Sequence, residues 1–329
     1  MTRTALILGI TGSIGGAVAE ALHSHGWRLK ALHRDPARVG SRTPVPGAVA
    51  LRHGDVGNRR DVVTAAADCD VIVHAVNPPG YRNWRGIAMP MLANTIAAAR
   101  ASGARILFPG NVYNYGPDAW PLVAEGSPQN PISRKGRVRA EMETMLRDAA
   151  GDGARAVVLR AGDFFGPRAP SSWFEHVLVK PGRPVRSITY PGDPNAGHAW
   201  AYVPDLAETF ARIADREQEL GPFETFHFGG HYLCPAAQMN DAIRRAAGVP
   251  RAPVHSLPWW AIRAASPFNR MFRELLEMRY LWRVSLQLDN RRLCDFLGEE
   301  PHTPLQEAVT ETLASLQCLP SNPPHEAPA

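Results

Sequence analysis

The 329-residue sequence contains only four cysteines, which are scattered along the chain at Cys69, Cys234, Cys294 and Cys318. No two of them form a CxxC pair, which argues against a dithiol or zinc-ribbon motif and favours a reduced, cytoplasmic setting. The 12 histidines include no HExxH spacing. We therefore predict no metal site.

Long apolar runs are also missing, and no stretch approaches the length of a membrane span. The first predicted strand begins by residue 4, which leaves no room for a secretory signal before it. The formal net charge is only +5, and the basic cluster from Arg134 to Arg139 has no interleaved aromatic residues. These absences predict a chain that binds neither nucleic acid nor membrane, whereas the small positive excess favours an anionic ligand such as a phosphorylated cofactor.

The most informative stretch lies near the start of the chain, where a short apolar run opens onto three glycines, Gly9, Gly12 and Gly15. The residues behind them have the three-to-four apolar spacing of a helix. A strand, a glycine turn and a helix N-terminus together form a site for a dinucleotide pyrophosphate. In this interpretation Gly9 permits the turn, Gly12 allows close approach of a phosphate, and Gly15 lets the helix pack against the strand. The residues predicted to bind the cofactor here are Gly9, Thr11, Gly12, Ser13, Ile14 and Gly15.

Strand and helix patterns alternate after this first unit. Further strands are predicted at 27–32, 49–52, 70–75, 105–108 and 156–160, and helices at about 89–101 and 136–149. The nearly continuous apolar character of residues 70–75 is typical of a strand that is covered on both faces. The expected fold is therefore α/β, a Rossmann-type doubly wound parallel sheet with helices on both faces.

The pattern loosens after residue 162, where Pro and Gly become frequent and an aromatic-rich segment follows at 258–282. We predict an NAD(P)-binding domain over 1–162, with its core completed by segments near 198–230. Residues 163–318 are predicted to form a smaller C-terminal α/β substrate lid over the carboxyl ends of the strands. The tail at 319–329 carries four prolines and is expected to be disordered.

The choice between NADP and NAD depends on the end of the second predicted strand. An acidic residue there accepts the 2′-hydroxyl of NAD, whereas a guanidinium pairs with the 2′-phosphate of NADP. Arg34 occupies this position and Arg38 follows on the same side. We therefore expect NADP(H), with NAD as the alternative because a register shift of one residue would present Asp35.

Several segments extend this pattern along residues 4–316. After Arg34-Asp35-Pro36 come HGDV at 53–56, HAVN at 74–77, NVYNYGP at 111–117, HAWAYVPDLA at 198–207 and the closing motifs from 289 to 305. Together they resemble the extended short-chain dehydrogenase/reductase superfamily, in particular its NAD-dependent epimerase/dehydratase branch and its atypical, NmrA-like neighbours. The resemblance implies that Asp55 and Val56 flank the adenine, and that Ala75, Val76 and Asn77 line the path to the nicotinamide ribose. It also implies that the chain could form a homodimer.

The superfamily's chemistry uses a serine or threonine after the fifth strand and a YxxxK pair on the next helix, and this sequence departs from both. The resemblance places Asn111 at the serine position, Lys135 at the tyrosine position and Arg139 at the lysine position. The spacing of four still puts Lys135 and Arg139 on one helix face. They could hold the cofactor or an anionic substrate, or they could belong to a solvated basic face with Arg134 and Arg137. Tyr113 is a further candidate for the missing proton donor.

Three functions remain open on the sequence. The first is an atypical NAD(P)(H)-dependent oxidoreductase that transfers hydride to a carbonyl or activated double bond, with Lys135, Tyr113 or a water as proton donor. The second is a non-catalytic NADP(H)-binding redox sensor. The third is a nucleotide-sugar epimerase or dehydratase, against which the altered YxxxK counts. The aromatic residues of the expected lid favour an apolar or aromatic small-molecule substrate.

Overall fold

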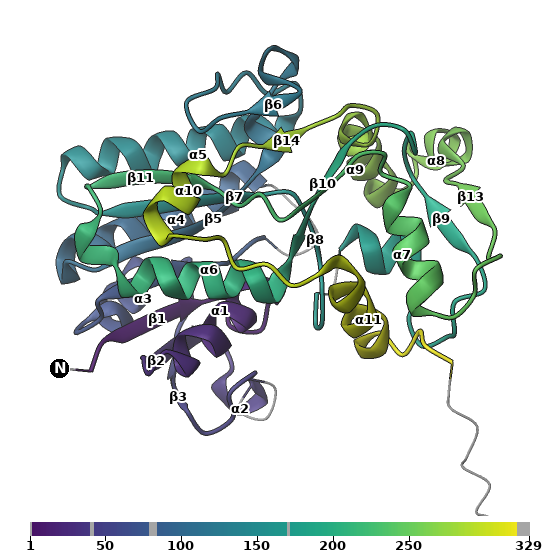
Figure 1. The fold of residues 1–329 in the computed structure, drawn as a ribbon. Coiled ribbons are helices and arrows are strands. Elements are labelled where there is room, and N and C mark those ends of the chain that lie inside the picture. The colour runs from purple at the N-terminus through teal and green to yellow at the C-terminus, as the bar shows by residue number, and fades with distance from the viewer. Residues whose placement is uncertain (1, 40–42, 79–83, 170–171, 321–329) are drawn as a thin grey trace, which may run out of the picture.

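The computed structural model describes residues 2–39, 43–78, 84–169 and 172–320. Its centre is a seven-stranded sheet in the order β11-β7-β5-β4-β1-β2-β3 (Figure 1). All neighbouring strands in this sheet are parallel. The strands are β1 (Thr4–Leu8), β2 (Arg28–His33), β3 (Val49–His53), β4 (Val71–His74), β5 (Arg105–Asn111), β7 (Ala156–Ala161) and β11 (Phe223–His227).

Helices cover both faces of the sheet, because its central strands are apolar on both sides. Along β1, Ala5 and Ile7 enter one core, which includes residues of α1 and α6. Leu6 and Leu8 enter the opposite core, which includes residues of α3, α4 and α5. These helices are α1 (Ser13–Ser24), α3 (Arg59–Ala66), α4 (Trp84–Ser102), α5 (Arg134–Gly151) and α6 (Val203–Asp215), and the short α2 (Pro36–Val39) and α10 (Arg291–Leu297) accompany them. The predicted doubly wound α/β fold is confirmed.

A smaller group of elements lies to one side of this sheet and is the region we call the lid lobe (Figure 1). It comprises β9 (Ile188–Tyr190), β13 (Val254–Ser256), α7 (Gln238–Ala246), α8 (Trp259–Ala265), α9 (Arg270–Met278) and α11 (Leu305–Ser315). A mixed sheet links it to the parallel sheet, with β8 (Asp163–Phe165), β10 (His198–Tyr202) and β12 (His231–Leu233) in the order β12-β10-β8. The lid lobe has a core of its own, which includes Phe174, Trp200 and Trp282.

Two short additions complete the fold. Strand β6 (Leu122–Val123) pairs in parallel with β14 (Gln287–Leu288), and a 3₁₀ turn, η3 (Val112–Asn114), follows β5. Across the described ranges no helix has both the length and the apolar character needed to cross a membrane. The same ranges contain no group of three or more His, Cys, Asp or Glu side chains that could hold a metal ion. Most of the predicted tail, from residue 321 onward, lies outside the described residues.

Candidate functional site

The turn between β1 and α1 is built around close backbone contacts that only glycine permits. Gly9 has a φ of +98°, and a Cβ there would lie 2.5 Å from the Ala75 carbonyl oxygen. A Cβ on Gly15 would lie 2.2 Å from the Gly9 oxygen. The first turn of α1 therefore packs directly on the loop after β1, as inferred for Gly15 from the sequence. That loop packs against the chain that leaves β4.

Gly12 differs from the other two glycines because its neighbourhood is open. A Cβ there would have only two neighbours within 4 Å, the nearer being the Gly9 oxygen at 3.3 Å. Gly12 is the N-cap residue of α1 and has no side chain with which to cap this helix. Thr11 and Gly12 are exposed, and Ser13 and Ile14 are half-buried in the first helical turn. An uncapped helix N-terminus with an adjacent open glycine fits a bound phosphate.

The sheet order places this turn at the switch point of the fold. β1 pairs with β2 on one side and with β4 on the other, so the chain leaves the two strands β1 and β4 in opposite directions. The Ala75 N–H donates to the Leu8 oxygen at 2.9 Å, which joins the ends of these two strands. The adjacent predicted residues, Ala75 and Val76, are half-buried, and Asn77 is exposed. Ligands of open α/β sheets bind in the crevice at such a point.

Arg34 and Asp35, at the end of β2, have different side-chain partners. The Asp35 carboxylate accepts from the backbone N–H of Arg38 at 3.3 Å and pairs with the Arg38 guanidinium at 3.2 Å. Arg34 is exposed, and no carboxylate of the described residues lies within ion-pair distance of its guanidinium. The Asp35 side chain thus serves the start of α2, while Arg34 remains at the strand end without such a partner.

Asp55 and Val56 lie on the neighbouring turn after β3. The Asp55 carboxylate accepts from the Gly57 N–H at 2.8 Å, and the Asp55 N–H donates to Asp61 at 2.9 Å. Val56 is buried, and its carbonyl accepts from the Asn94 side chain at 2.9 Å. Both residues are therefore held in fixed positions at the carboxyl edge of the sheet.

After β5 the chain forms η3, and the side chain of Asn111 caps it. The Asn111 oxygen accepts from the Tyr113 N–H at 3.0 Å. Tyr113 is half-buried, and a Cβ on Gly136 would lie 2.1 Å from the Tyr113 carbonyl oxygen. The start of α5 therefore packs directly on η3, which brings together Asn111, Tyr113 and the first turn of α5.

Lys135 and Arg139 point inward from α5, whereas Arg134 and Arg137 are exposed. Only 8% of Lys135 and 8% of Arg139 is exposed, so the alternative of a solvated basic face is wrong for these two residues. The Arg139 guanidinium donates to the Asn77 side chain at 3.1 Å and lies 5.0 Å from the Trp84 ring centre. It thereby links α5 to the chain leaving β4.

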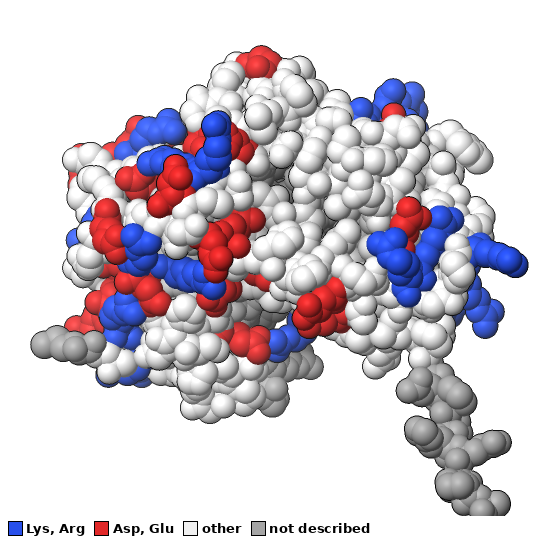
Figure 2. All heavy atoms as spheres, viewed as in Figure 1, with Lys and Arg blue, Asp and Glu red and all other residues white. Residues whose placement is uncertain are grey.

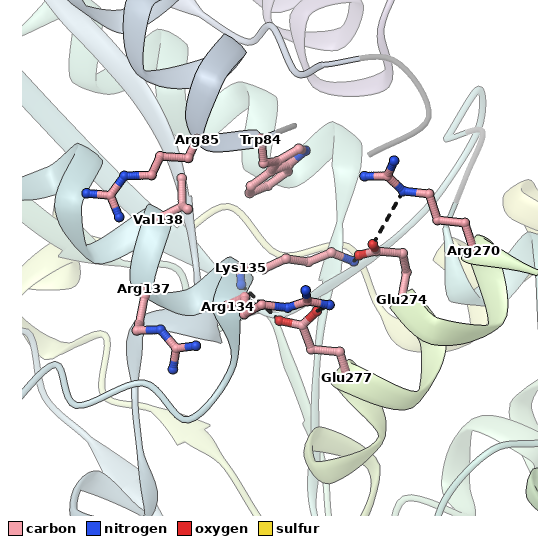
Figure 3. A pocket seen from close by; sticks show the side chains of 9 residues that line it. All are labelled: Trp84, Arg85, Arg134, Lys135, Arg137, Val138, Arg270, Glu274 and Glu277. Carbon is pink, nitrogen blue, oxygen red and sulfur yellow. Dashed lines mark hydrogen bonds and ion pairs between the residues drawn. The ribbon is translucent and has the colours of Figure 1, made fainter. Parts of the chain in front are cut away.

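The partners of Lys135 come from α9 of the lid lobe, about 140 residues further along the chain. Its ammonium pairs with Glu274 at 2.9 Å, and its backbone N–H donates to Glu277 at 3.0 Å. Figure 3 shows both glutamates reaching from α9 toward the start of α5. A cavity of about 350 Å³ lies between these helices. Its lining residues are Trp84, Arg85, Arg134, Lys135, Arg137, Val138, Arg270, Glu274 and Glu277.

Burial near this cleft shifts the pKa values of two neighbouring residues. Burial, assisted by the positive charge of Arg139, lowers the pKa of His74 to about 3. His74 at the end of β4 is therefore neutral near pH 7, and its Nδ1 is 2.8 Å from the Thr95 hydroxyl. Burial raises the pKa of Tyr280 to about 12. A hydrogen bond with the Ser133 side chain opposes this effect.

A second polar pair lies where β8 and β10 meet. His198 Nε2 is 2.9 Å from the Asp163 carboxylate, and the His198 ring stacks on Trp282 with centres 4.0 Å apart. The pairing of Asp163 with His198 was missed, because it depends on the parallel register between β8 and β10, in which Trp200 lies opposite Asp163.

Comparison with known proteins places this geometry in a family. Residues 5–229, about two thirds of the chain, match the model of the NAD dependent epimerase/dehydratase family. The chain belongs to that family. The resemblance to the extended short-chain dehydrogenase/reductase superfamily inferred from the motifs is thereby confirmed.

The chain also resembles several individual proteins, at low sequence identity. It is 33% identical over 170 residues to a UDP-glucose 4-epimerase of Azospirillum brasilense, a match that covers 47% of each chain. The matched regions span only about half the length of the curated relatives. A solved UDP-galactose 4-epimerase superposes with a TM-score of 0.73 at 19% identity, over 96% of this chain and 99% of that one. Bordetella bronchiseptica WbmH, solved with NAD⁺, gives a TM-score of 0.70 at 19% identity over the same shares. These structural matches establish the shared fold.

Proposed function

We propose that this chain is a nicotinamide-dinucleotide-dependent oxidoreductase that reduces a carbonyl group of a small molecule. Three features support cofactor binding at the β1/β4 switch point: the open Gly12, the uncapped α1 N-terminus and the Gly9–Ala75 contact. Gly9, Thr11, Gly12, Ser13, Ile14 and Gly15 would hold the pyrophosphate, Asp55 and Val56 the adenine, and Ala75, Val76 and Asn77 the nicotinamide ribose. When bound, the dinucleotide supplies a hydride.

The observation that carries the reaction class is the Lys135–Glu274 ion pair. Lys135 stands where the superfamily has its tyrosine, and a lysine ammonium can donate a proton. A reduction needs such a donor at the substrate oxygen, whereas an epimerisation that begins by oxidising a hydroxyl needs a base there. In this proposal Lys135 donates the proton, Arg139 holds the neighbouring chain after β4 through Asn77, and Asn111 fixes η3 with Tyr113 beside it.

The cofactor we propose is NADP(H), because Arg34 has no carboxylate partner among the described residues while Asp35 is engaged by Arg38. Relatives solved with NAD⁺ leave NAD as the alternative. Arg34→Ala is expected to weaken NADPH binding about 10- to 100-fold, since a charge-assisted contact contributes about 1.5–3 kcal/mol. NADH binding should change less than twofold. Calorimetric titration checks both, with the exposed Arg28→Ala at the start of β2 as the matched control.

The catalytic role of Lys135 is tested by Lys135→Met. Turnover of NADPH with a panel of aldehydes and ketones should fall about 10²- to 10⁴-fold, as expected when a general acid is lost. NADPH affinity should remain within about twofold. Arg137→Met, on the same helix but exposed, is the control that should retain turnover. If Lys135→Met keeps full turnover while Tyr113→Phe loses it, Tyr113 is the donor and the assignment to Lys135 is wrong.

A nucleotide-sugar epimerase is the second candidate, and one observation besides the relatives' names favours it. A cavity of about 330 Å³ in the lid lobe is lined by two arginines, Arg279 and Arg283, and one acidic residue, Asp193, together with Tyr190 and Trp259. Cationic and aromatic side chains suit a nucleoside diphosphate better than the apolar or aromatic substrate that the sequence favoured. Conversion of a UDP-sugar with no net oxidation of the cofactor would establish this function. Tight cofactor binding without turnover of any substrate would instead indicate a redox sensor.

A further inference from the structure

The outer surface of the lid lobe carries three large apolar side chains that face solvent. Trp260, Phe268 and Met271 are 80%, 93% and 62% exposed. They account for three of the six exposed large hydrophobic residues of the described chain and lie within 12 positions of one another. Trp and Phe of such exposure are unusual on a globular surface that has no partner.

The exposure of Trp260 is not a result of loose local packing. The adjacent Trp259 is anchored, because its ring nitrogen donates to the Pro191 oxygen at 2.7 Å and Arg279 lies 5.0 Å from its ring centre. Ile262, two residues later, is buried. The helix therefore has a well-defined inner side, and Trp260 belongs to the outer one.

A hydrogen-bonded turn joins α8 to α9. The N–H groups of Phe268 and Asn269 both donate to the Ala265 oxygen at 3.1 Å. Trp260 lies on α8 and Phe268 on the turn directly after it, so only a short connection separates the two exposed side chains. Asn269 then caps α9 by accepting from the Met271 N–H at 2.9 Å, which places Met271 in the first turn of the next helix.

Basic side chains surround this apolar group without acidic ones. From Ala242 to Arg273 the chain contains six arginines and neither aspartate nor glutamate. Arg263, Arg270 and Arg273 are exposed beside Trp260, Phe268 and Met271. The next acidic residues, Glu274 and Glu277, pair with residues of α5, and Glu274 also pairs with Arg270 at 3.8 Å (Figure 3), so Arg263 and Arg273 carry the basic character of this face. In Figure 2 the lid lobe carries blue clusters over α7 and near α9 and a red cluster over α11, whereas the parallel sheet carries mixed red and blue.

We propose that this face, which we call the α8–α9 tip and define as Trp260, Arg263, Phe268, Met271 and Arg273, docks on an anionic lipid bilayer. Protruding aromatic and apolar side chains insert at the interface between headgroups and acyl chains, and arginines pair with anionic headgroups. With 7 and 9 residues, α8 and α9 are too short to cross a bilayer. The chain would therefore lie on the membrane, an association that goes beyond the proposed enzymatic function and departs from the absence of membrane binding expected from the sequence.

Charge favours this occupant over a second copy of the chain. A two-fold symmetric contact through the tip would bring each arginine cluster against its own copy, with no exposed carboxylate in the segment to neutralise it. An anionic bilayer instead supplies a negative charge over the whole face. The proposal therefore predicts binding that requires both the apolar and the basic side chains.

The test is co-sedimentation of the full chain with vesicles of phosphatidylcholine alone and of phosphatidylcholine mixed with phosphatidylserine. We expect binding to the mixed vesicles that is at least tenfold stronger than to phosphatidylcholine and that weakens with added salt. The double variants Trp260→Ser/Phe268→Ser and Arg263→Gln/Arg273→Gln should each reduce it at least tenfold. Controls on other exposed surfaces, Leu122→Ser and Arg59→Gln/Arg60→Gln, should bind as the unaltered chain does.

Several results would overturn the proposal. One is equal binding to both vesicle types, and another is binding that the tip variants do not reduce. A third is absence of vesicle binding. This result overturns the proposal whether or not the chain instead self-associates or binds a single-stranded oligonucleotide through the tip residues. Because every altered residue is exposed and none belongs to the cofactor crevice, NADPH titration of the same variants distinguishes failure of this proposal from failure of the proposed function.

Discussion

Gly15→Ala is expected to abolish dinucleotide binding and to destabilise the fold. A Cβ at this position would lie 2.2 Å from the Gly9 oxygen, 2.8 Å from the Gly9 carbonyl carbon and 3.2 Å from the Ala75 Cβ. These atoms belong to backbone or to a short side chain, so α1 must move away from the β1 turn. Forced overpacking of this kind typically costs about 1–3 kcal/mol or more. Urea unfolding and NADPH titration measure the two effects.

Gly12→Ala separates binding from stability at the same turn. Its Cβ would meet the Gly9 oxygen at 3.3 Å and would otherwise occupy open space, so the free energy of unfolding should change by less than about 1 kcal/mol. NADPH affinity should nevertheless fall at least tenfold, because the Cβ fills the place proposed for the pyrophosphate. Gly151→Ala, which meets no heavy atom within 4 Å, is the matched control. Unchanged NADPH binding in both Gly12→Ala and Gly15→Ala would contradict the proposed cofactor site.

Glu143→Gln is expected to cost about 3–5 kcal/mol of unfolding free energy, because it leaves the buried Arg160 charge without its counter-ion. Arg160 is 0% exposed and Glu143 1% exposed. The guanidinium makes three contacts with this carboxylate, at 2.6, 3.1 and 3.1 Å. Burial alone would lower the pKa of Arg160, but the Glu143 carboxylate outweighs that effect and raises it, so the guanidinium stays charged.

This pair also fixes α5 against the sheet. Glu143 lies on α5 and accepts from the Asn114 side chain at 2.7 Å, while Arg160 lies on β7 and bonds to the Tyr115 hydroxyl at 2.5 Å. Urea unfolding of Glu143→Gln measures the loss. Asp152→Asn, which alters an exposed ion pair with Arg100, should leave the midpoint unchanged. If the unfolding free energy of Glu143→Gln lies within about 1 kcal/mol of that of the unaltered chain, Arg160 finds another counter-charge and the prediction is wrong.

The sequence located those parts of the site that depend on local patterns. The β1–α1 turn could be predicted because strand, glycines and helical spacing occur within 20 residues. The shared face of Lys135 and Arg139 followed from their spacing of four. The start of α4 was predicted at about residue 89 and lies at Trp84, because a proline at 90 favours a helix start just before it, although here the helix continues through it.

Contacts between distant segments could not be predicted in this way. Glu274 and Glu277 pair with α5 only because α9 folds back over it, and nothing in their own neighbourhood marks them as partners of Lys135. The two-residue pairing of β6 with β14 is likewise too short to leave a pattern. Strand β11 completes the parallel sheet beside β7 after the chain has passed through β8, β9 and β10. For it the sequence indicated only that a segment near 198–230 returns to the core.

The measurement that tests the central claim most directly is titration of the purified chain with NADPH and then with NADH, followed by nicotinamide fluorescence. The account predicts saturable binding of both, with NADPH bound at least tenfold more tightly because of Arg34. Equal or stronger binding of NADH would mean that Asp35 leaves Arg38 to contact the ribose, and the NADP(H) assignment would be wrong. Absence of saturable binding by either dinucleotide would contradict the proposed function as a whole.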